Sequence, residues 1–455
     1  RPPRYLCVVR FHDHSSAAHT FLISSFLKSL VADARGLTIR SILTVFFAAL
    51  LAVSMTCSPF LLSISMWGFV AMAWWDSAVS VDPGGLRRPS TWWKALVRSF
   101  RRFFRHRALL PVTLLFFVPA LSYFWSDDHA YWLERTRIRV PFFVLPWAFA
   151  NLPALTKRQF RLALYLLVWS LAVICAGVLI NFALHFDAII ADLGMGRPMP
   201  VPRSHIRFSL VLATGIFTGA WLWFDGFYWK WRRERRLLAL VTVFLFVCIH
   251  VISVRSGIAG LYAVLLFSAG RFIWKTRRWG LGLAALSAIL IVPLIAIQAI
   301  PSFKMRVEYM KWDWLQYRQN IGSQYSDSER WISLEAGLDL WRAHPVLGVG
   351  AGDLPEEIRR TVTTRYPEYR EAPKLPHNQF LYILAGTGLL GLLASMIAFM
   401  APVARAQSRR FYLFAAFQIL AFTSFLVEYT IETAMGAAFY LFYTLWFFKM
   451  AEQES

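Results

Sequence analysis

Long apolar stretches separated by short polar segments recur along almost the whole chain. Stretches of about twenty apolar residues match the thickness of the hydrocarbon core of a membrane. We therefore expect an all-α polytopic membrane protein with twelve transmembrane helices. The predicted spans are residues 41–57, 59–76, 108–125, 140–154, 162–184, 207–228, 237–253, 256–274, 279–301, 377–402, 411–428 and 433–449.

Composition supports this interpretation and argues against a soluble globular protein. Hydrophobic residues make up 57% of the chain and charged residues 16%, whereas soluble domains average about 45–50% and about 25%. The cysteines are scattered singly, with no pair at metal-ligand or redox spacing, so no disulfide scaffold or thiolate metal site is expected. They are Cys7, Cys57, Cys175 and Cys248.

The net charge of +22 predicts sidedness rather than a nucleic-acid partner. In a membrane protein, Lys and Arg accumulate in cytoplasmic segments and face anionic lipid headgroups. If the chain starts in the cytoplasm, the inner segments carry 30 of the 48 basic residues and the short outer loops carry 7. This bias predicts cytoplasmic termini and membrane lipids as partners, with no nucleic acid bound.

The same alternation divides the chain into five segments. The N-terminus lacks the pattern of a cleavable signal peptide, and the one sizeable polar segment is too long for an idle connection. The expected segments are a cytoplasmic lead (1–40), nine spans (41–301), a helical outer domain (302–376), three spans (377–450) and a cytoplasmic tail (451–455).

The outer segment predicts two helices. Ser326 and Glu329 match a capping box, and apolar residues follow at helical spacing until His344 precedes a proline, which predicts an amphipathic helix over 327–343. The apolar positions are Trp331, Leu334, Leu338 and Trp341. A second helix is expected over 355–365.

Two arginines stand out at the outer membrane boundary. Arg255 lies in a turn so short that its cation must snorkel to lipid phosphate or belong to an anion site. Arg330 falls near the start of the predicted outer helix, where the helix dipole disfavours a cation. A local pair with an acidic neighbour or a bound phosphate would relieve that conflict. The acidic neighbours are Asp327, Glu329 and Glu335.

Other polar residues at this boundary are further candidates. Arg203 and Arg207 precede the sixth span as further anion-binding candidates. His377 follows a proline and is expected in the first turn of the tenth span, either as an interfacial polar residue or as a neutral general base. Glu428 and Glu432 flank the last outer turn as acid, base or orienting groups.

Several sequence patterns that could suggest ligand or metal binding are interpreted as structural instead. The glycine-rich segment 347–353 follows a helix rather than a strand and is expected to be a flexible connection rather than a phosphate loop. Asp127, Asp128 and His129 are expected to be solvated rather than to bind a metal. Three nearby glycines are expected to permit helix packing; they are Gly386, Gly388 and Gly391. The sequence therefore predicts no metal and no cofactor.

Three blocks of residues together resemble the bacterial O-antigen ligase and polymerase family. They are Val254-Arg255-Ser256-Gly257, then Ser328-Glu329-Arg330-Trp331 running to Pro345-Val346-Leu347-Gly348-Val349-Gly350, and Pro376-His377-Asn378-Gln379-Phe380 followed by Gly386-Thr387-Gly388. The spacing of the blocks is the specific part of the resemblance, because each block alone is weak.

The resemblance implies a membrane glycosyltransferase, an O-antigen ligase of the bacterial inner membrane. Such an enzyme moves O-antigen from undecaprenyl diphosphate to a sugar hydroxyl of lipid A-core oligosaccharide on the periplasmic face, without metal and with inversion. Carried over residue by residue, His377 would be the base, and Arg255 and Arg330 would stabilise the diphosphate. Arg203, Arg207 and Asn378 are expected to contact the substrate.

The sequence also allows other functions. An O-antigen polymerase or a protein O-oligosaccharyltransferase would share the three blocks and differ in the acceptor. A polytopic lipid or glycan transporter explains many spans equally well, but it predicts ionisable residues near mid-membrane and repeated half-chains. The sequence shows no such repeat, and its charges gather at the predicted boundaries.

Overall fold

The computed structural model describes residues 39–81, 89–318, 326–366 and 373–453, so most of the predicted cytoplasmic lead lies outside the described residues. Every element in those ranges is helical, which confirms the all-α class. The elements are α2 (Ile39–Cys57), α3 (Pro59–Val81), α4 (Pro89–Phe104), η1 (Leu110–Thr113), α5 (Leu114–Leu121), η2 (Ser122–Trp125), α6 (His129–Arg139), α7 (Pro141–Ala150), α8 (Lys157–Leu184), α9 (Phe186–Gly194), α10 (His205–Phe224), α11 (Glu234–Ile252), α12 (Arg255–Thr276), α13 (Trp279–Ala299), α14 (Pro301–Arg318), α15 (Ser326–Ala343), α16 (Leu354–Arg365), α17 (Gln379–Val403), α18 (Ala406–Arg410), α19 (Tyr412–Val427), η3 (Thr430–Glu432) and α20 (Ala434–Gln453).

Seven described helices are long and apolar enough to cross a membrane, which fits a multi-pass membrane protein. They are α2, α8, α10, α11, α12, α13 and α17. Two further apolar stretches, Leu110–Trp125 and Tyr412–Val427, are shorter. The predicted number of twelve spans is therefore not confirmed.

Two predicted spans differ from the observed elements. The stretch 108–125 is α-helical only between Leu114 and Leu121 and is 3-10 helical on either side. Pro111 and Pro119 account for much of this irregularity, since each lacks the N–H of a regular helical hydrogen bond. The predicted span 140–154 ends as α7 at Ala150, after only ten residues.

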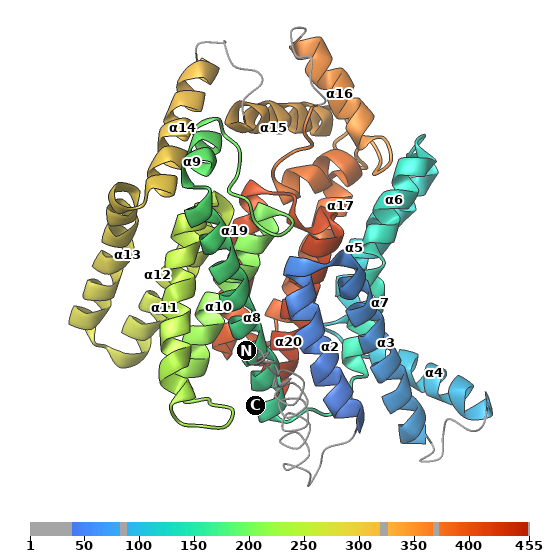
Figure 1. Cartoon of the computed structure of the whole chain (residues 1–455). Coiled ribbons are helices and arrows are strands. Elements are labelled where there is room, and N and C mark those ends of the chain that lie inside the picture. The colour runs from blue at the N-terminus through green and yellow to red at the C-terminus, as the bar shows by residue number, and fades with distance from the viewer. Residues whose placement is uncertain (1–38, 82–88, 319–325, 367–372, 454–455) are drawn as a thin grey trace, which may run out of the picture.

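The helices form an upright bundle with two different ends (Figure 1). We call the end that carries α9, α14, α15 and α16 the site end, and the end that carries α4 and the α10–α11 turn the far end. Helix α20 lies inside the bundle and buries Tyr440, Tyr443 and Trp446 almost completely. Helix α13 lies at the periphery, with only 11% of its apolar stretch buried.

Two helices of the site end lie where the sequence predicted helices. Helices α15 and α16 confirm the helical stretches predicted over 327–343 and 355–365. However, α15 buries Ile332, Ala336 and Leu340 rather than the predicted apolar stripe. Its Trp331 is 47% exposed and packs against Trp314 of α14, with ring centroids 6.1 Å apart. Gly337, beside this stripe, lets α15 approach α17 closely, because a Cβ there would lie 3.2 Å from Leu381 and 2.7 Å from Pro376.

Helix α17 is interrupted at Gly388, whose φ of 65° lies outside the helical region. The loop from Pro345 to Gly350 fills the interruption through backbone hydrogen bonds. The amides of Val349 and Gly350 donate to carbonyls of the first half of α17, and the carbonyls of Pro345 and Val346 accept from the second half. The predicted flexible connection is therefore hydrogen-bonded into a membrane helix. Gly388 is required because a Cβ there would lie 2.2 Å from the Val346 backbone.

Candidate functional site

His377 lies at the site end, immediately before α17 rather than in its first turn. The expected helix start was wrong because Asn378, not the proline two residues earlier, caps the helix. The Asn378 side chain accepts hydrogen bonds from the amides of Phe380 and Leu381, both at 3.0 Å. Its amide group also donates to the Leu426 carbonyl of α19 at 3.1 Å. His377 is thereby fixed between α17 and the end of α19.

His377, Glu428 and Arg330 form one hydrogen-bonded group. The Glu428 carboxylate follows α19, is 1% exposed and lies 3.2 Å from His377 Nδ1. Its second oxygen accepts from Arg330 Nη2 of α15 at 2.8 Å. The expected local partners of Arg330 are therefore replaced by a carboxylate 98 positions away. The imidazole also packs against Tyr429, with ring centroids 5.3 Å apart.

The charge state of Glu428 determines the role of the imidazole. Burial by itself raises the pKa of the Glu428 carboxyl, but the hydrogen bond from His377 and the charges of Arg330, His377 and Arg207 outweigh burial and lower it. An ionised carboxylate only accepts hydrogen bonds, so the ring proton belongs on Nδ1. His377 Nε2 is then the acceptor nitrogen, and it is buried without a hydrogen-bond partner among the described residues.

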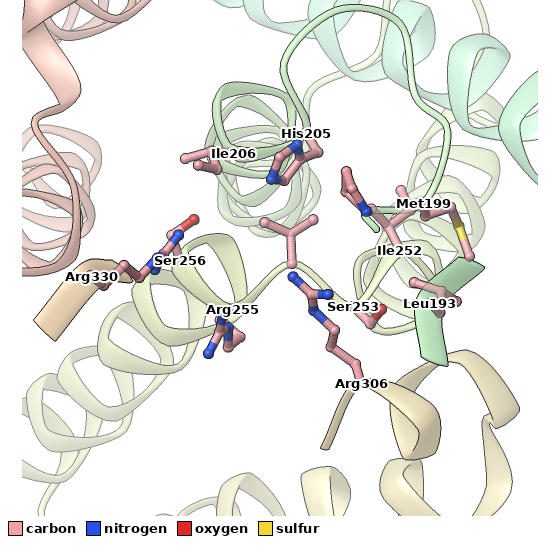
Figure 2. A pocket seen from close by; sticks show the side chains of 12 residues that line it. Leu193, Met199, His205, Ile206, Ile252, Ser253, Arg255, Ser256, Arg306 and Arg330 are labelled. Atoms are coloured by element: carbon pink, nitrogen blue, oxygen red, sulfur yellow. The ribbon is translucent and has the colours of Figure 1, made fainter. Parts of the chain in front are cut away.

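A small, partly open cavity adjoins this group, with about 380 Å³ of unoccupied space when the adjoining open solvent is included. Arg255, the first residue of α12, Arg306 of α14 and Arg330 of α15 all line it. Figure 2 shows the three side chains approaching the same opening from different elements, with His205 of α10 across from them. Because Arg330 lines the cavity and also contacts Glu428, it connects the cationic cavity to His377.

Two of the cavity's arginines are held by their surroundings. Ser253 adopts a left-handed conformation, with φ of 54°, and this bend starts α12 at Arg255. Arg306 is 9% exposed and donates to the Gly196 carbonyl at 2.9 Å, which ties α14 to the loop after α9. A preorganised set of cations of this kind favours an anionic ligand.

The remaining predicted substrate residues have different surroundings. Arg203 Nε donates to the Cys57 carbonyl at 3.4 Å, and this exposed residue is not among those that line the cavity. Arg207 contacts Ser204 at 3.5 Å, while its Nε and Nη2 are buried without partners among the described residues. Arg207 is close enough to contribute to the lowered pKa of Glu428. Asn378 serves as a helix cap.

Glu432 belongs to a second buried hydrogen-bonded group. It accepts from Arg139 at 2.6 and 2.7 Å and from Gln379 Nε2 at 2.7 Å. Gln379 in turn accepts from the Ile431 amide at 3.0 Å. These contacts hold the turn after Glu428 against the start of α17, so they position the carboxylate and the histidine relative to each other.

The patterns interpreted as structural all have protein partners. Asp353 accepts from the amides of Asp127 and Asp128, and His129 stacks on Tyr123 with centroids 4.4 Å apart. The amides of Ala351 and Gly352 donate to serine hydroxyls, so the glycine-rich loop offers no free phosphate cradle. No group of three or more potential metal ligands lies within residues 39–81, 89–318, 326–366 and 373–453.

The arrangement places a nitrogen that can accept a proton near a cluster of arginines that can bind an anion. His377 Nε2 can take a proton from a hydroxyl, and the arginine-lined cavity can hold an anionic leaving group. Sequence reasoning missed Arg306 and His205, because neither is part of a motif. It noted Glu428 as an acid, base or orienting group but gave it no partner, because His377 lies 51 positions earlier in the chain.

Residues 240–396 match the family model described as O-antigen ligase. This segment begins inside α11 and ends inside α17, so it contains Arg255, Arg330 and His377, whereas Glu428 lies beyond it. The chain has no significant match among curated proteins. The three residues that the family resemblance singled out are those that the fold gathers around one cavity and one carboxylate. Over this segment, about a third of its length, the chain is similar to the O-antigen ligase family.

Proposed function

We propose that the protein is an O-antigen ligase, which transfers a glycan from undecaprenyl diphosphate to a sugar hydroxyl of lipid A-core oligosaccharide. The observation that carries the proposal is the hydrogen-bonded sequence from His377 through Glu428 to Arg330, with Arg330 lining the cationic cavity. A base and a diphosphate site are what glycosyl transfer from a lipid diphosphate requires.

The donor diphosphate would occupy the cavity. Arg255, Arg306 and Arg330 would contact its oxygens, which places positive charge where negative charge develops as the leaving group departs. Arginine suits this role because its planar guanidinium donates two hydrogen bonds to phosphate and stays charged. These three cations would neutralise the diphosphate without a metal ion.

The acceptor hydroxyl would lie at His377 Nε2. This nitrogen takes the proton as the hydroxyl oxygen forms a bond to the anomeric carbon. The bond from that carbon to the diphosphate oxygen breaks, and its electron pair stays on the phosphate oxygen. Attack opposite the leaving group inverts the anomeric configuration. Glu428 keeps the proton on Nδ1 and stabilises the imidazolium that forms.

The protein would lie in the bacterial inner membrane. Its site end would face the periplasm and its far end would face the cytoplasm. Helices α9 and α14 to α16 would cover the diphosphate site from the aqueous side. The polyprenyl chain would remain in the membrane, beside the apolar helices.

Glycan transfer in purified protein tests the proposal. The wild type should transfer undecaprenyl-diphosphate-linked glycan to lipid A-core in the presence of EDTA and without nucleotide. His377→Ala and Arg330→Ala should each lose at least about a hundredfold in rate. His344→Ala and Arg197→Ala are matched controls, because both residues are exposed at the site end and neither lines the cavity.

The acceptor decides between family activities. Lengthening of the glycan on its lipid carrier, without transfer to lipid A-core, would identify a polymerase. Transfer to a hydroxyl of a protein would identify a protein O-oligosaccharyltransferase. An untouched donor with folded wild type would refute glycosyl transfer and leave transport as the alternative.

A further inference from the structure

Helix α4 at the far end has three separate faces, each a stripe at helical spacing. Its protein-facing stripe is almost fully buried; it consists of Thr91, Ala95, Ser99 and Phe103. A second stripe is apolar and faces outward, with Trp93 68%, Val97 41% and Phe104 59% exposed. The third stripe lies one position further along the chain and is basic and exposed; it consists of Lys94, Arg98, Arg101 and Arg105.

The apolar and basic stripes adjoin along a shallow open groove. The groove is lined by both stripes, including Trp93 and Phe104 together with Arg101 and Arg105. Exposing the large apolar side chains of the second stripe to water would be costly. A helix with an apolar stripe beside a basic stripe is typical of the membrane interface.

The electrostatic environment of α4 favours an anion. No Asp or Glu occurs between residues 83 and 126, whereas the basic stripe and its neighbours contribute a dense positive charge. Arg98 is anchored to the Ser80 carbonyl at 3.0 Å. In the described part of the chain, Lys94, Arg101 and Arg105 form no ion pair.

The position of α4 in the fold matches this chemistry. It lies crosswise to the upright α3 at the far end of the bundle (Figure 1). Its buried stripe packs against α3 and α7. Trp147 of α7 donates to the Ser99 hydroxyl at 3.3 Å, and the Asn151 amide donates to the Ser99 carbonyl at 3.2 Å. The helix is therefore held in place against α3 and α7.

We propose that α4 is a binding site for an anionic phospholipid. The acyl chains lie along Trp93, Val97 and Phe104, and the headgroup phosphate contacts Arg101 and Arg105. Helix α4 lies at the opposite end of the bundle from α15 and α16 (Figure 1), so this site is separate from the proposed glycan-transfer site and does not depend on it.

Native mass spectrometry of the delipidated, full-length protein in neutral detergent tests this site. The probes are phosphatidylglycerol, which is anionic, and phosphatidylcholine, which is not. Wild type should bind phosphatidylglycerol more tightly, and the double variant Arg101→Glu/Arg105→Glu should weaken that binding at least about tenfold. Binding of phosphatidylcholine should be equal in both proteins.

A matched control separates the site from net charge. The double variant Arg232→Glu/Arg236→Glu makes the same charge change on exposed residues near α11 and should leave phosphatidylglycerol affinity within about threefold of wild type. Equal losses in both double variants would overturn the proposal, because binding would then follow overall charge. Equal affinity of wild type for the two lipids would also overturn it.

Two further measurements decide the matter if the charge-reversed variant does not fold. Arg101→Lys/Arg105→Lys keeps both charges and should retain phosphatidylglycerol affinity within about threefold. In wild type, raising the salt concentration from about 0.05 to about 0.5 M should weaken phosphatidylglycerol binding and leave phosphatidylcholine binding unchanged. Loss of binding in the Lys variant, or no response to salt, would refute a headgroup site on these two residues.

Discussion

Replacing Glu428 with Gln tests the orienting role of the carboxylate directly. The substitution preserves the size of the side chain but removes its charge and converts one acceptor oxygen into an NH₂ donor. In the wild type, both carboxylate oxygens accept, from His377 at 3.2 Å and from Arg330 at 2.8 Å. In the variant, the NH₂ group can satisfy the histidine only if Nδ1 becomes an acceptor. The ring proton then moves to Nε2, which removes the base.

The size of the effect follows from these contacts. Each hydrogen bond to a charged group contributes about 1.5–3 kcal/mol, and the Glu428 side chain is only 1% exposed, so solvent compensates little. General-base catalysis contributes about 10²–10⁴ in rate, or about 2.7–5.4 kcal/mol. We expect Glu428→Gln to lose about 10²–10⁴ in kcat and to change KM much less, because the altered tautomer acts on the chemical step.

The assay is glycan transfer to lipid A-core under single-turnover and steady-state conditions. Glu308→Gln is the matched control, since Glu308 is 53% exposed on α14 and lies 3.9 Å from Lys304. It should transfer glycan within about threefold of wild type. Thermal unfolding in detergent, measured for all three proteins, establishes that the variants are folded.

A folded Glu428→Gln protein with a kcat close to that of wild type would refute the orienting role. A large rise in KM with kcat unchanged would also contradict it, since that pattern marks loss of substrate binding rather than loss of the base. His377 would then have to act without control of its tautomer, and the proposed mechanism would fail at that step.

Three further outcomes follow from the structure. Gly388→Ala should lower the free energy of unfolding by about 2–4 kcal/mol, measured by thermal or denaturant unfolding in detergent, because its φ is 65° and a Cβ would overlap the neighbouring loop; Gly177→Ala, with no atom within 4 Å of a new Cβ, should have no destabilising effect. Because the pKa of Glu428 is lowered from 4.5 in the folded protein, its contribution to stability is complete above pH 4.5 and is lost as the pH falls through the lower folded value; the stability gap between wild type and Glu428→Gln should therefore shrink as the pH falls below 4.5, and a gap that stays unchanged or grows there would contradict the assignment. Arg306→Gln should reduce kcat/KM about tenfold or more in the transfer assay, whereas Arg197→Gln, whose side chain is 68% exposed, should not.

Much of the fold was accessible from the sequence because local patterns determine it. The apolar stretch 256–274 became α12, and the capping pattern before residue 327 located α15 to within one residue. The sequence did not predict details that depend on packing between helices. The buried stripe of α15 is the one with Ala336 and Gly337, where α17 and the loop before it approach closely. The hydrophobicity of single residues carries no information about such an approach.

The candidate site shows the same division. Residue type and position at a predicted boundary were enough to single out His377, Arg255 and Arg330. Their mutual arrangement was not accessible, because Arg330 pairs with Glu428 across 98 positions rather than with an acidic residue on its own helix. Asn378 is the opposite case. Asn is a common helix cap, so its role could be predicted locally, but Pro376 two residues earlier also favours a helix start and indicated the wrong one.

The interruption of α17 has a consequence for how the chain enters the membrane. A broken helix leaves amides and carbonyls that lipid cannot satisfy, each at a cost of several kcal/mol, and here the loop from Pro345 to Gly350 satisfies four of them. That loop precedes α17 in the chain, so during synthesis it leaves the ribosome first. The loop groups that hydrogen-bond to α17 have therefore already been synthesised when Gly388 emerges. In a chain circularly permuted between this loop and α17, the interrupted helix would have to insert before the loop had been synthesised.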